Sequence, residues 1–126
     1  MRDRERLEAG AVSELQGIGR FQFHEVGKLE EFKRSSAQAM EIVRAKDTGT
    51  LQYEIYFSDD QSEAIVLERY RDSEALIEHA VNLGELGPAI LATGLVSSEL
   101  LGEPSAELRA KLADGPVHLF TPFLSM

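Results

Sequence analysis

The sequence predicts an α+β fold in which one antiparallel β-sheet carries its helices on a single face. The first observation is the stretch of residues 48–79, which has the pattern of strand, hairpin, strand and helix. Its two apolar runs, residues 51–57 and 64–70, have the length and composition of strands, and the turn-forming residues 58–62 separate them. The second observation is the element order, because a strand and a long helix precede this stretch and a further strand follows it. That order is typical of the split βαβ, or ferredoxin-like, arrangement.

The N-terminal part of the chain consists of a charged segment, a strand and a helix. Residues 1–16 alternate in charge and then become small and polar, which predicts a flexible arm. Residues 18–26 are the expected first strand, in which Phe21 and Phe23 point to the same face of the sheet. Residues 28–46 repeat apolar side chains at helical spacing, so they predict a helix.

The C-terminal part adds a helix over residues 73–83 and then a longer segment of less regular pattern. Residues 86–116 are expected to be an added strand and helix. Within this segment, residues 95–101 favour a strand, with a helix as the alternative. Residues 117–124 predict the last strand, and Pro122 confines that strand to a sheet edge because proline has no N–H to donate.

Length, charge and cysteine content restrict the class of protein. Residues 17–126 are enough for one domain but not for two. The net charge of −9 argues against binding to nucleic acid or to an anionic membrane surface. The chain has no cysteine, which excludes a disulfide framework and a thiol nucleophile. The first residues lack the apolar core of a signal peptide, and no apolar run approaches the ~20 residues of a membrane span. We therefore expect a cytoplasmic protein.

The face of the sheet that points away from the helices is expected to mix polar and apolar side chains. The expectation assumes that Phe57 lies opposite Glu63 across the hairpin. The face then carries side chains from three strands, namely Gln52, Glu54, Tyr56, Ala64, Val66, Glu68, Tyr70, Arg20, Gln22 and His24. Such a surface is too apolar to face water and too polar for an ordinary core. We expect two copies to meet through it as a homodimer, with a cavity between the two sheets.

Residues 18–85 contain a set of spaced residues, namely Gly49-x-x-x-Tyr53, the hairpin aspartates, Glu68-x-Tyr70-x-Asp72, Ala75-Leu76 and His79. In these residues the stretch resembles the antibiotic biosynthesis monooxygenase-like (ABM) family. It implies a dimeric α+β barrel that oxygenates a phenolic or quinol-type substrate without flavin, metal or other cofactor. In better-understood members an Asn and a Trp on the third strand support this reaction, and the positions that match them here are Val66 and Tyr70.

Two histidines are the candidate catalytic residues. His79 lies beside the apolar stripe of its helix and could act as a base, anchor a substrate or make a purely structural hydrogen bond. His24 could act as a general base or pair with an acidic residue across the dimer. The candidate substrate-binding residues share the expected cavity face, and they are Arg20, Gln22, Glu54, Tyr56, Val66, Glu68 and Tyr70. No two histidines have the spacing of metal ligands, so we expect no metal site.

Two functions from different classes follow from these residues. The first is a cofactor-free, monooxygenase-like enzyme that acts on a small aromatic or quinol-type substrate. The second is a non-catalytic dimeric module that binds a small apolar or aromatic molecule or another protein. Oxygen consumption with a panel of quinols distinguishes the two.

Overall fold

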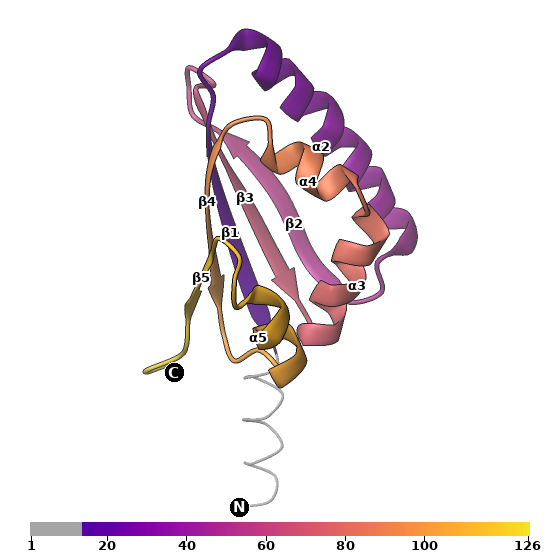
Figure 1. The fold of residues 1–126 in the computed structure, drawn as a ribbon, viewed down its shortest axis with the longest axis vertical. Helices are drawn as coiled ribbons and strands as arrows, with labels where there is room; N and C mark the ends of the chain where they lie inside the picture. The colour runs from indigo at the N-terminus through magenta and orange to yellow at the C-terminus, as the bar shows by residue number, and fades with distance from the viewer. Residues whose placement is uncertain (1–13) are drawn as a thin grey trace, which may run out of the picture.

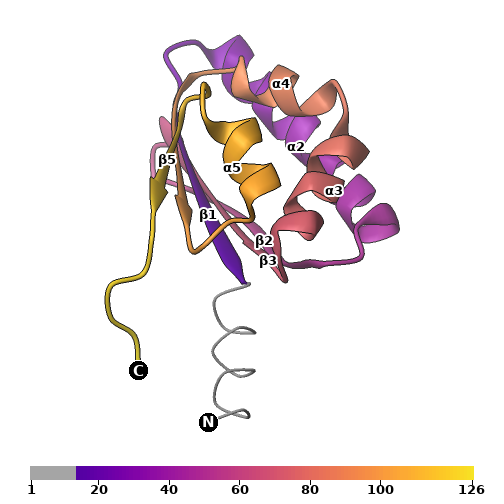
Figure 2. The same ribbon diagram turned by 60° about the horizontal axis from the view of Figure 1, so that its bottom comes forward.

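The computed structural model describes residues 14–126, which form a five-stranded β-sheet with helices on one face (Figure 1). The predicted α+β class and ferredoxin-like arrangement are confirmed. In chain order the elements are β1 (Leu15–Gln22), α2 (Val26–Lys46), β2 (Thr50–Phe57), β3 (Glu63–Tyr70), α3 (Ser73–Leu83), α4 (Leu86–Leu91), β4 (Leu95–Leu101), α5 (Ala106–Leu112) and β5 (Val117–Phe120). Figure 2 shows α2, α3, α4 and α5 on the same side of the sheet. No helix in this part of the chain is long and apolar enough to span a bilayer.

The strands lie in the order β2-β3-β1-β4-β5. Neighbouring strands are antiparallel except β4 and β5, which are parallel, so the prediction of a wholly antiparallel sheet is wrong at this edge. The reason is α5, which carries the chain back along β4 before β5 begins, as a parallel connection requires. The edge position predicted for the last strand is confirmed, and the strand ends at Phe120, before Pro122.

The first strand begins and ends earlier than predicted. β1 starts at Leu15, whose side chain is fully buried, so residues 15 and 16 belong to the sheet and not to an arm. The rest of the predicted arm, residues 1–13, lies outside the described residues. At the other end, α2 begins at Val26 and therefore takes the last residue of the predicted strand.

The register of the β2–β3 hairpin differs by one residue from the predicted register. Phe57 lies opposite Ala64, not opposite Glu63. Glu63 instead closes the loop, because the Ser58 amide donates a hydrogen bond to the Glu63 carbonyl at 3.0 Å. Since side chains alternate between the two faces of a strand, a shift of one residue exchanges the faces of β3.

This exchange decides which side chains of β3 face the helices. Ala64, Val66 and Tyr70 are buried on the helix side, and Glu68 shares their face. Leu67 points to the opposite, open face of the sheet, where the prediction had placed Glu68 and Tyr70.

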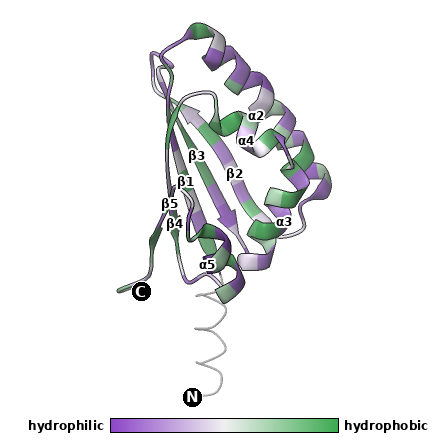
Figure 3. Ribbon diagram, viewed as in Figure 1, coloured by the Kyte–Doolittle hydropathy of each residue, from purple (hydrophilic) through white to green (hydrophobic). Residues whose placement is uncertain are grey.

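Two apolar clusters fill the space between the sheet and the helices. The first lies under α2 and α4 and is built from Phe21, Phe23, Phe32, Ala39, Ala64, Val66 and Ile90. The second lies near α5 and contains Leu15, Tyr70, Ala75, Leu100 and Leu108. Hydrophilic and hydrophobic residues alternate along α2, whereas α4 is mostly hydrophobic (Figure 3). The buried residues of α2 recur at helical spacing, as its sequence pattern predicts, and they are Phe32, Ser36, Ala39 and Val43.

Gly49 allows the turn after α2 to lie directly against the start of α3. A Cβ atom at this position would lie 2.5 Å from Cβ of Ala75, a distance that real side chains do not reach. The Gly49 carbonyl also accepts a hydrogen bond from the Arg71 amide at 2.8 Å. This close approach brings the end of α2 within hydrogen-bonding distance of α3.

Phe32 is the centre of the larger cluster, and Phe32→Ala is expected to lower the free energy of unfolding by about 3–5 kcal/mol. The side chain is fully buried, and its ring lies 4.8 Å from Phe21 and 4.9 Å from Phe23, centroid to centroid. Urea denaturation measures the change. The matched control is Phe123→Ala, which should change stability by less than about 0.5 kcal/mol because Phe123 is 90% exposed. Equal effects of the two substitutions would contradict this view of the core.

Candidate functional site

A cavity of about 300 Å³ lies between the sheet and the pair α3 and α4. Its walls are mainly apolar and include Phe21, Val66, Leu83, Ile90 and Leu91. Its polar side chains are few, namely Ser36, Tyr53, Glu68, His79 and Ser98. A cavity with apolar walls and a few polar groups is typical of a small-molecule site. It is formed by one chain on the helix side of the sheet, whereas the sequence predicted a cavity between two sheets.

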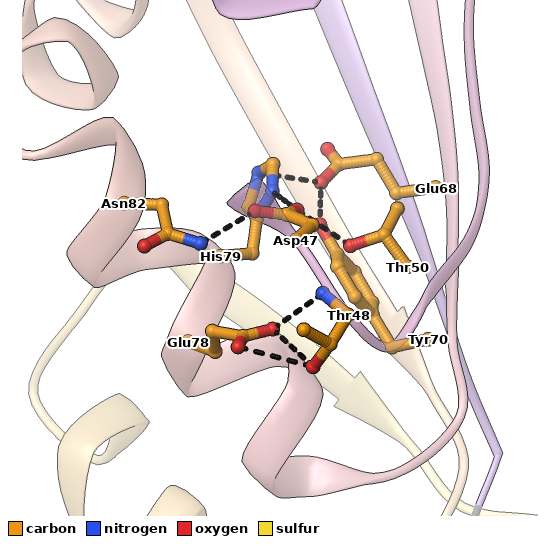
Figure 4. Close-up of polar contacts among 8 residues, drawn as sticks. All are labelled: Asp47, Thr48, Thr50, Glu68, Tyr70, Glu78, His79 and Asn82. Atoms are coloured by element: carbon orange, nitrogen blue, oxygen red, sulfur yellow. Dashed lines mark hydrogen bonds and ion pairs between the residues drawn. The ribbon is translucent and has the colours of Figure 1, made fainter. Parts of the chain in front are cut away.

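His79 is held at the wall of this cavity by α3. The helix begins at its cap Asp72, whose carboxylate accepts a hydrogen bond from the Ala75 amide at 2.9 Å. His79 is 7% exposed, and its Nδ1 lies 2.8 Å from Oδ2 of Asp47 (Figure 4). Thr48, which follows Asp47, also contacts α3, because its amide donates a hydrogen bond to Glu78 Oε1 at 2.9 Å. The histidine ring is therefore fixed by a carboxylate from the end of another helix.

Asp47 accepts hydrogen bonds from three directions. Asn82 Nδ2 donates to Oδ1 at 2.8 Å, and Thr50 Oγ1 donates to Oδ2 at 2.6 Å. The Asp47 side chain is 1% exposed. Burial by itself would raise the pKa of Asp47, but the hydrogen bonds from Asn82, Thr50 and His79 outweigh it and hold the pKa below its usual range. Asp47 is therefore ionised and can only accept, so the proton of the His79 ring lies on Nδ1 and the free Nε2 is the basic atom.

Glu68 lies on the other side of the histidine ring. Its Oε1 is 3.6 Å from His79 Nε2 and accepts a short hydrogen bond from the Tyr70 hydroxyl. Burial raises the pKa of Glu68, and the Tyr70 hydrogen bond and the nearby His79 oppose that rise only in part. The Glu68 side chain is 24% exposed and lines the cavity. Glu68 thus holds a proton more readily than an ordinary glutamate.

Two tyrosines complete the polar group. The ring centroids of Tyr53 and Tyr70 lie 5.5 and 5.3 Å from that of His79. Burial raises the pKa of both phenols, and the negative charges of Glu68 and Asp47 add to this effect. Both hydroxyls therefore stay protonated and can donate hydrogen bonds. The cluster combines an oriented base, a readily protonated carboxyl group and two donors, which is a set of groups suited to proton transfer.

The structure brings some of the predicted site residues together and separates others. Val66, Glu68 and His79 line the cavity, and Tyr70 adjoins them. The other predicted site residues lie away from the cavity. Four of them are on the open face of the sheet, namely Arg20, Gln22, Glu54 and Tyr56, and the fifth, His24, is exposed just before α2. Arg20 and Tyr56 instead line a separate hollow of about 260 Å³ on that open face. The one-residue error in register explains why the prediction placed both groups on a single surface.

Sequence reasoning missed Asp47, Thr50, Tyr53 and Asn82 as candidate site residues. Asp47 follows the last residue of α2 and lies 32 residues before His79, so no local pattern connects the two. One local signal was present, because His79 and Asn82 are three residues apart and so lie on one side of α3. Among residues 14–126, no three His, Cys, Asp or Glu side chains are arranged to hold a metal ion.

The raised pKa of Glu68 predicts how stability changes with pH. The folded state holds the Glu68 proton more tightly than the unfolded chain, so ionisation lowers stability as pH rises above the ordinary glutamate value of about 4.3. Glu68→Gln removes this penalty. We expect the variant to gain stability over the natural protein between about pH 4 and pH 8, with the smallest difference at the acidic end. Urea denaturation across this range measures it, and Glu63→Gln, an exposed hairpin site, is the matched control. A gain that does not depend on pH would contradict the prediction.

Comparison with known proteins identifies the family. The model of the antibiotic biosynthesis monooxygenase family matches residues 18–83, which is just over half of the chain. The protein is a member of this family. The family match ends at the last residue of α3, so α4, β4, α5 and β5 lie beyond it. A search of the curated proteins found no significant match.

Solved structures share the fold of this chain. MupZ from Pseudomonas fluorescens is 25% identical with a TM-score of 0.76, over 90% of this chain and 93% of MupZ. Rv0793 from Mycobacterium tuberculosis is 24% identical with a TM-score of 0.62, over 74% of this chain and 97% of the other. SnoaB, a cofactor-independent oxygenase from Streptomyces nogalater, is 15% identical with a TM-score of 0.59, over 75% and 96% of the two chains. At these identities the last two show a shared fold.

Proposed function

We propose that this ABM-family protein is a cofactor-free oxygenase that begins its reaction by removing a proton from a small aromatic, phenolic or quinol-type substrate. The observation that carries the proposal is the basic Nε2 of His79 at the wall of an apolar cavity, with Nδ1 held 2.8 Å from ionised Asp47. A substrate hydroxyl in this cavity would give its proton to Nε2. The likeness to SnoaB, which is described as a cofactor-independent oxygenase, points to the same class of reaction.

The groups around His79 have separate roles in this proposal. Asp47 orients the ring and stabilises the imidazolium that forms when Nε2 takes the proton. Tyr53 lines the cavity, and its hydroxyl would donate a hydrogen bond to the substrate oxyanion. Glu68, whose pKa is raised by burial, supplies or takes up the second proton of the reaction. The apolar walls limit water around the anion, which strengthens these interactions.

The overall reaction balances with dioxygen as the single co-reactant. The substrate anion passes one electron to O₂, and the resulting radical pair joins to form a carbon–oxygen bond and a peroxide. The peroxide loses water to leave a carbonyl group, so a ring C–H becomes C=O, one oxygen atom enters the product and the other leaves as water. The four electrons lost by the substrate equal the four taken up by O₂.

Oxygen uptake by metal-free protein with a panel of quinols and naphthols tests the proposal. We expect consumption that depends on both protein and substrate, with one O₂ used per molecule of quinone formed. Consumption equal to that of the substrate alone would overturn it. If such molecules bind but are not oxidised, the protein is the non-catalytic binding module that the sequence analysis also considered.

We further propose that the protein acts as a homodimer joined through the open face of the sheet. That face carries apolar side chains that one chain leaves accessible, among them Leu95, which is 62% exposed, and Tyr56, which is 53% exposed. A second copy would cover them, and an interface of ordinary size buries about 1,200–2,000 Å² in total. Sedimentation velocity at micromolar concentration should show a dimer. Leu67→Glu, which places a charge on the same face, should give a monomer, and a monomeric natural protein would contradict the proposal.

A further inference from the structure

A second cavity of about 140 Å³ adjoins the first cavity, beside α5. Gly19, Glu68 and Ser98 line both cavities, so the two cavities are adjacent at these residues. The far wall of the second cavity is apolar and is formed by Leu76, Leu100, Leu112 and Val117. The rest of the lining includes the polar residues Glu68, Tyr70, Ser98 and Glu99. A cavity of this size is large enough for one benzene ring, as a cavity of about 150 Å³ is in another protein.

Three of the four residues in the apolar far wall come from the part of the chain beyond the family match. Leu100 lies on β4, Leu112 on α5 and Val117 on β5, and all three follow residue 83. The polar group of the first cavity, with His79 and Glu68, comes from the matched region. The apolar wall of the second cavity therefore depends largely on the added elements of this chain, next to a polar site that the family elements form.

Two glycines of β1 keep the floor of the cavities free of side chains. Gly17 lines the second cavity, and Gly19 lines both. A Cβ atom at Gly17 would meet only Glu68 Cβ, at 3.6 Å, and one at Gly19 would meet Phe21 and Val66 at 3.6 and 3.8 Å. These are ordinary contact distances, so packing does not require glycine at either position. Glycine within a strand weakens it and often marks a place where a ligand approaches the backbone.

We propose that the bound molecule has two parts, an aromatic head in the first cavity and an apolar substituent, a short alkyl chain or one further ring, in the second. The two parts join over Gly17 and Gly19, which places the reacting centre beside His79 and Glu68. The inference rests on the proposed function, because it takes the first cavity to be the substrate site. It goes further by assigning the second cavity, and the elements around it, to the choice of substrate.

The experiment measures binding of 2-naphthol and of 2-naphthols that carry a methyl, propyl or benzyl group. Naphthol fluorescence reports binding directly, since the chain contains no tryptophan to obscure it. We expect the affinity to rise about fourfold for each methylene group until the second cavity is full. Affinities that do not rise with the substituent would overturn the inference.

Gly17→Ala places a methyl group in the second cavity and is expected to weaken binding of the best-fitting substituted naphthol about fourfold or more. The affinity for 2-naphthol itself should stay unchanged. The matched control is Gly27→Ala, because a Cβ at Gly27 meets nothing within 4 Å. Leu112→Phe fills the same cavity from α5 and gives the same test if Gly17→Ala does not fold. Equal weakening of substituted and unsubstituted naphthols would overturn the inference.

Binding and turnover separate this inference from the proposed function. If substituted naphthols bind more tightly but are not oxidised, the inference holds and the oxygenase proposal fails. If 2-naphthol is oxidised but substituents bring no gain in affinity, the oxygenase proposal holds and the inference fails.

Discussion

Replacement of His79 by glutamine is expected to lower kcat for oxygen uptake by about 10²–10⁴-fold, the usual contribution of a positioned general base. Glutamine can still donate a hydrogen bond to Asp47, but its amide cannot take a proton at neutral pH. The loss should therefore appear in kcat, with a smaller change in KM. Steady-state oxygen consumption with the best substrate of the quinol panel measures both constants.

His24→Gln is the matched control for this prediction, because it makes the same chemical change at the other candidate histidine. His24 is exposed and lies in the segment between β1 and α2, outside the residues that line the cavity. We expect its kcat to equal that of the natural protein. A large loss in His24→Gln together with an active His79→Gln would place the base at His24 and would exclude the mechanism proposed above.

Asp47→Asn is expected to lower kcat by about 10²-fold or more and to leave KM nearly unchanged. The asparagine amide can donate to His79 Nδ1, which favours the ring form with its proton on Nε2 and so removes the basic atom from the cavity. Asp47 is a positioning residue, since it acts through His79, and its effect should also appear in the pH profile. We expect the pH profile of kcat/KM to differ between the variant and the natural protein, because the variant lacks the ionised partner of the base.

The same substitution has a predicted effect on stability. Asp47 accepts three hydrogen bonds in a nearly inaccessible position, and loss of its charge should lower the free energy of unfolding by about 1.5–3 kcal/mol at pH 7. Because the pKa of Asp47 is lowered by folding, its contribution is complete above the unfolded value of about 3.9 and is lost as pH falls through the folded value. The difference between the two proteins should therefore shrink below about pH 4. Asp59→Asn in the exposed hairpin is the control, and a difference that persists at low pH would contradict the assignment.

Val66 and Tyr70 occupy the positions that match the Asn and Trp of better-understood family members, so the polar groups of this site come from other residues. Val66 lines the cavity with an apolar side chain, and Tyr70 packs against His79 and donates to Glu68. The polar groups of this cavity are therefore supplied by Glu68, His79 and Tyr53. We expect the proton-transfer role to reside in these residues, and the predictions for His79 and Asp47 test that expectation.

The sequence by itself predicted most of the elements and their order, whereas it did not predict α4 and left residues 95–101 open between strand and helix. Helical spacing of apolar residues predicted α2 and α3, alternation and β-branched composition predicted β2 and β3, and Pro122 predicted the edge position of the last strand. These signals are local, because each depends on side chains within one turn of a helix or a few residues of a strand. The candidate His79 was also identifiable in this way, since its position beside the apolar stripe of α3 is a property of one helix.

Only the tertiary structure decided which side chains meet. The register of the hairpin depends on one residue of loop geometry, and it turned Glu68 and Tyr70 toward the helices and left Arg20, Glu54 and Tyr56 on the open face. The pairing of Asp47 with His79 joins residues 32 positions apart, through a turn that Gly49 allows to pack against α3. Such contacts come from the packing of whole elements against one another, so no local pattern encodes them. Local sequence patterns therefore predicted most elements and the candidate His79, whereas the packing of the elements against one another formed the cavity beside His79.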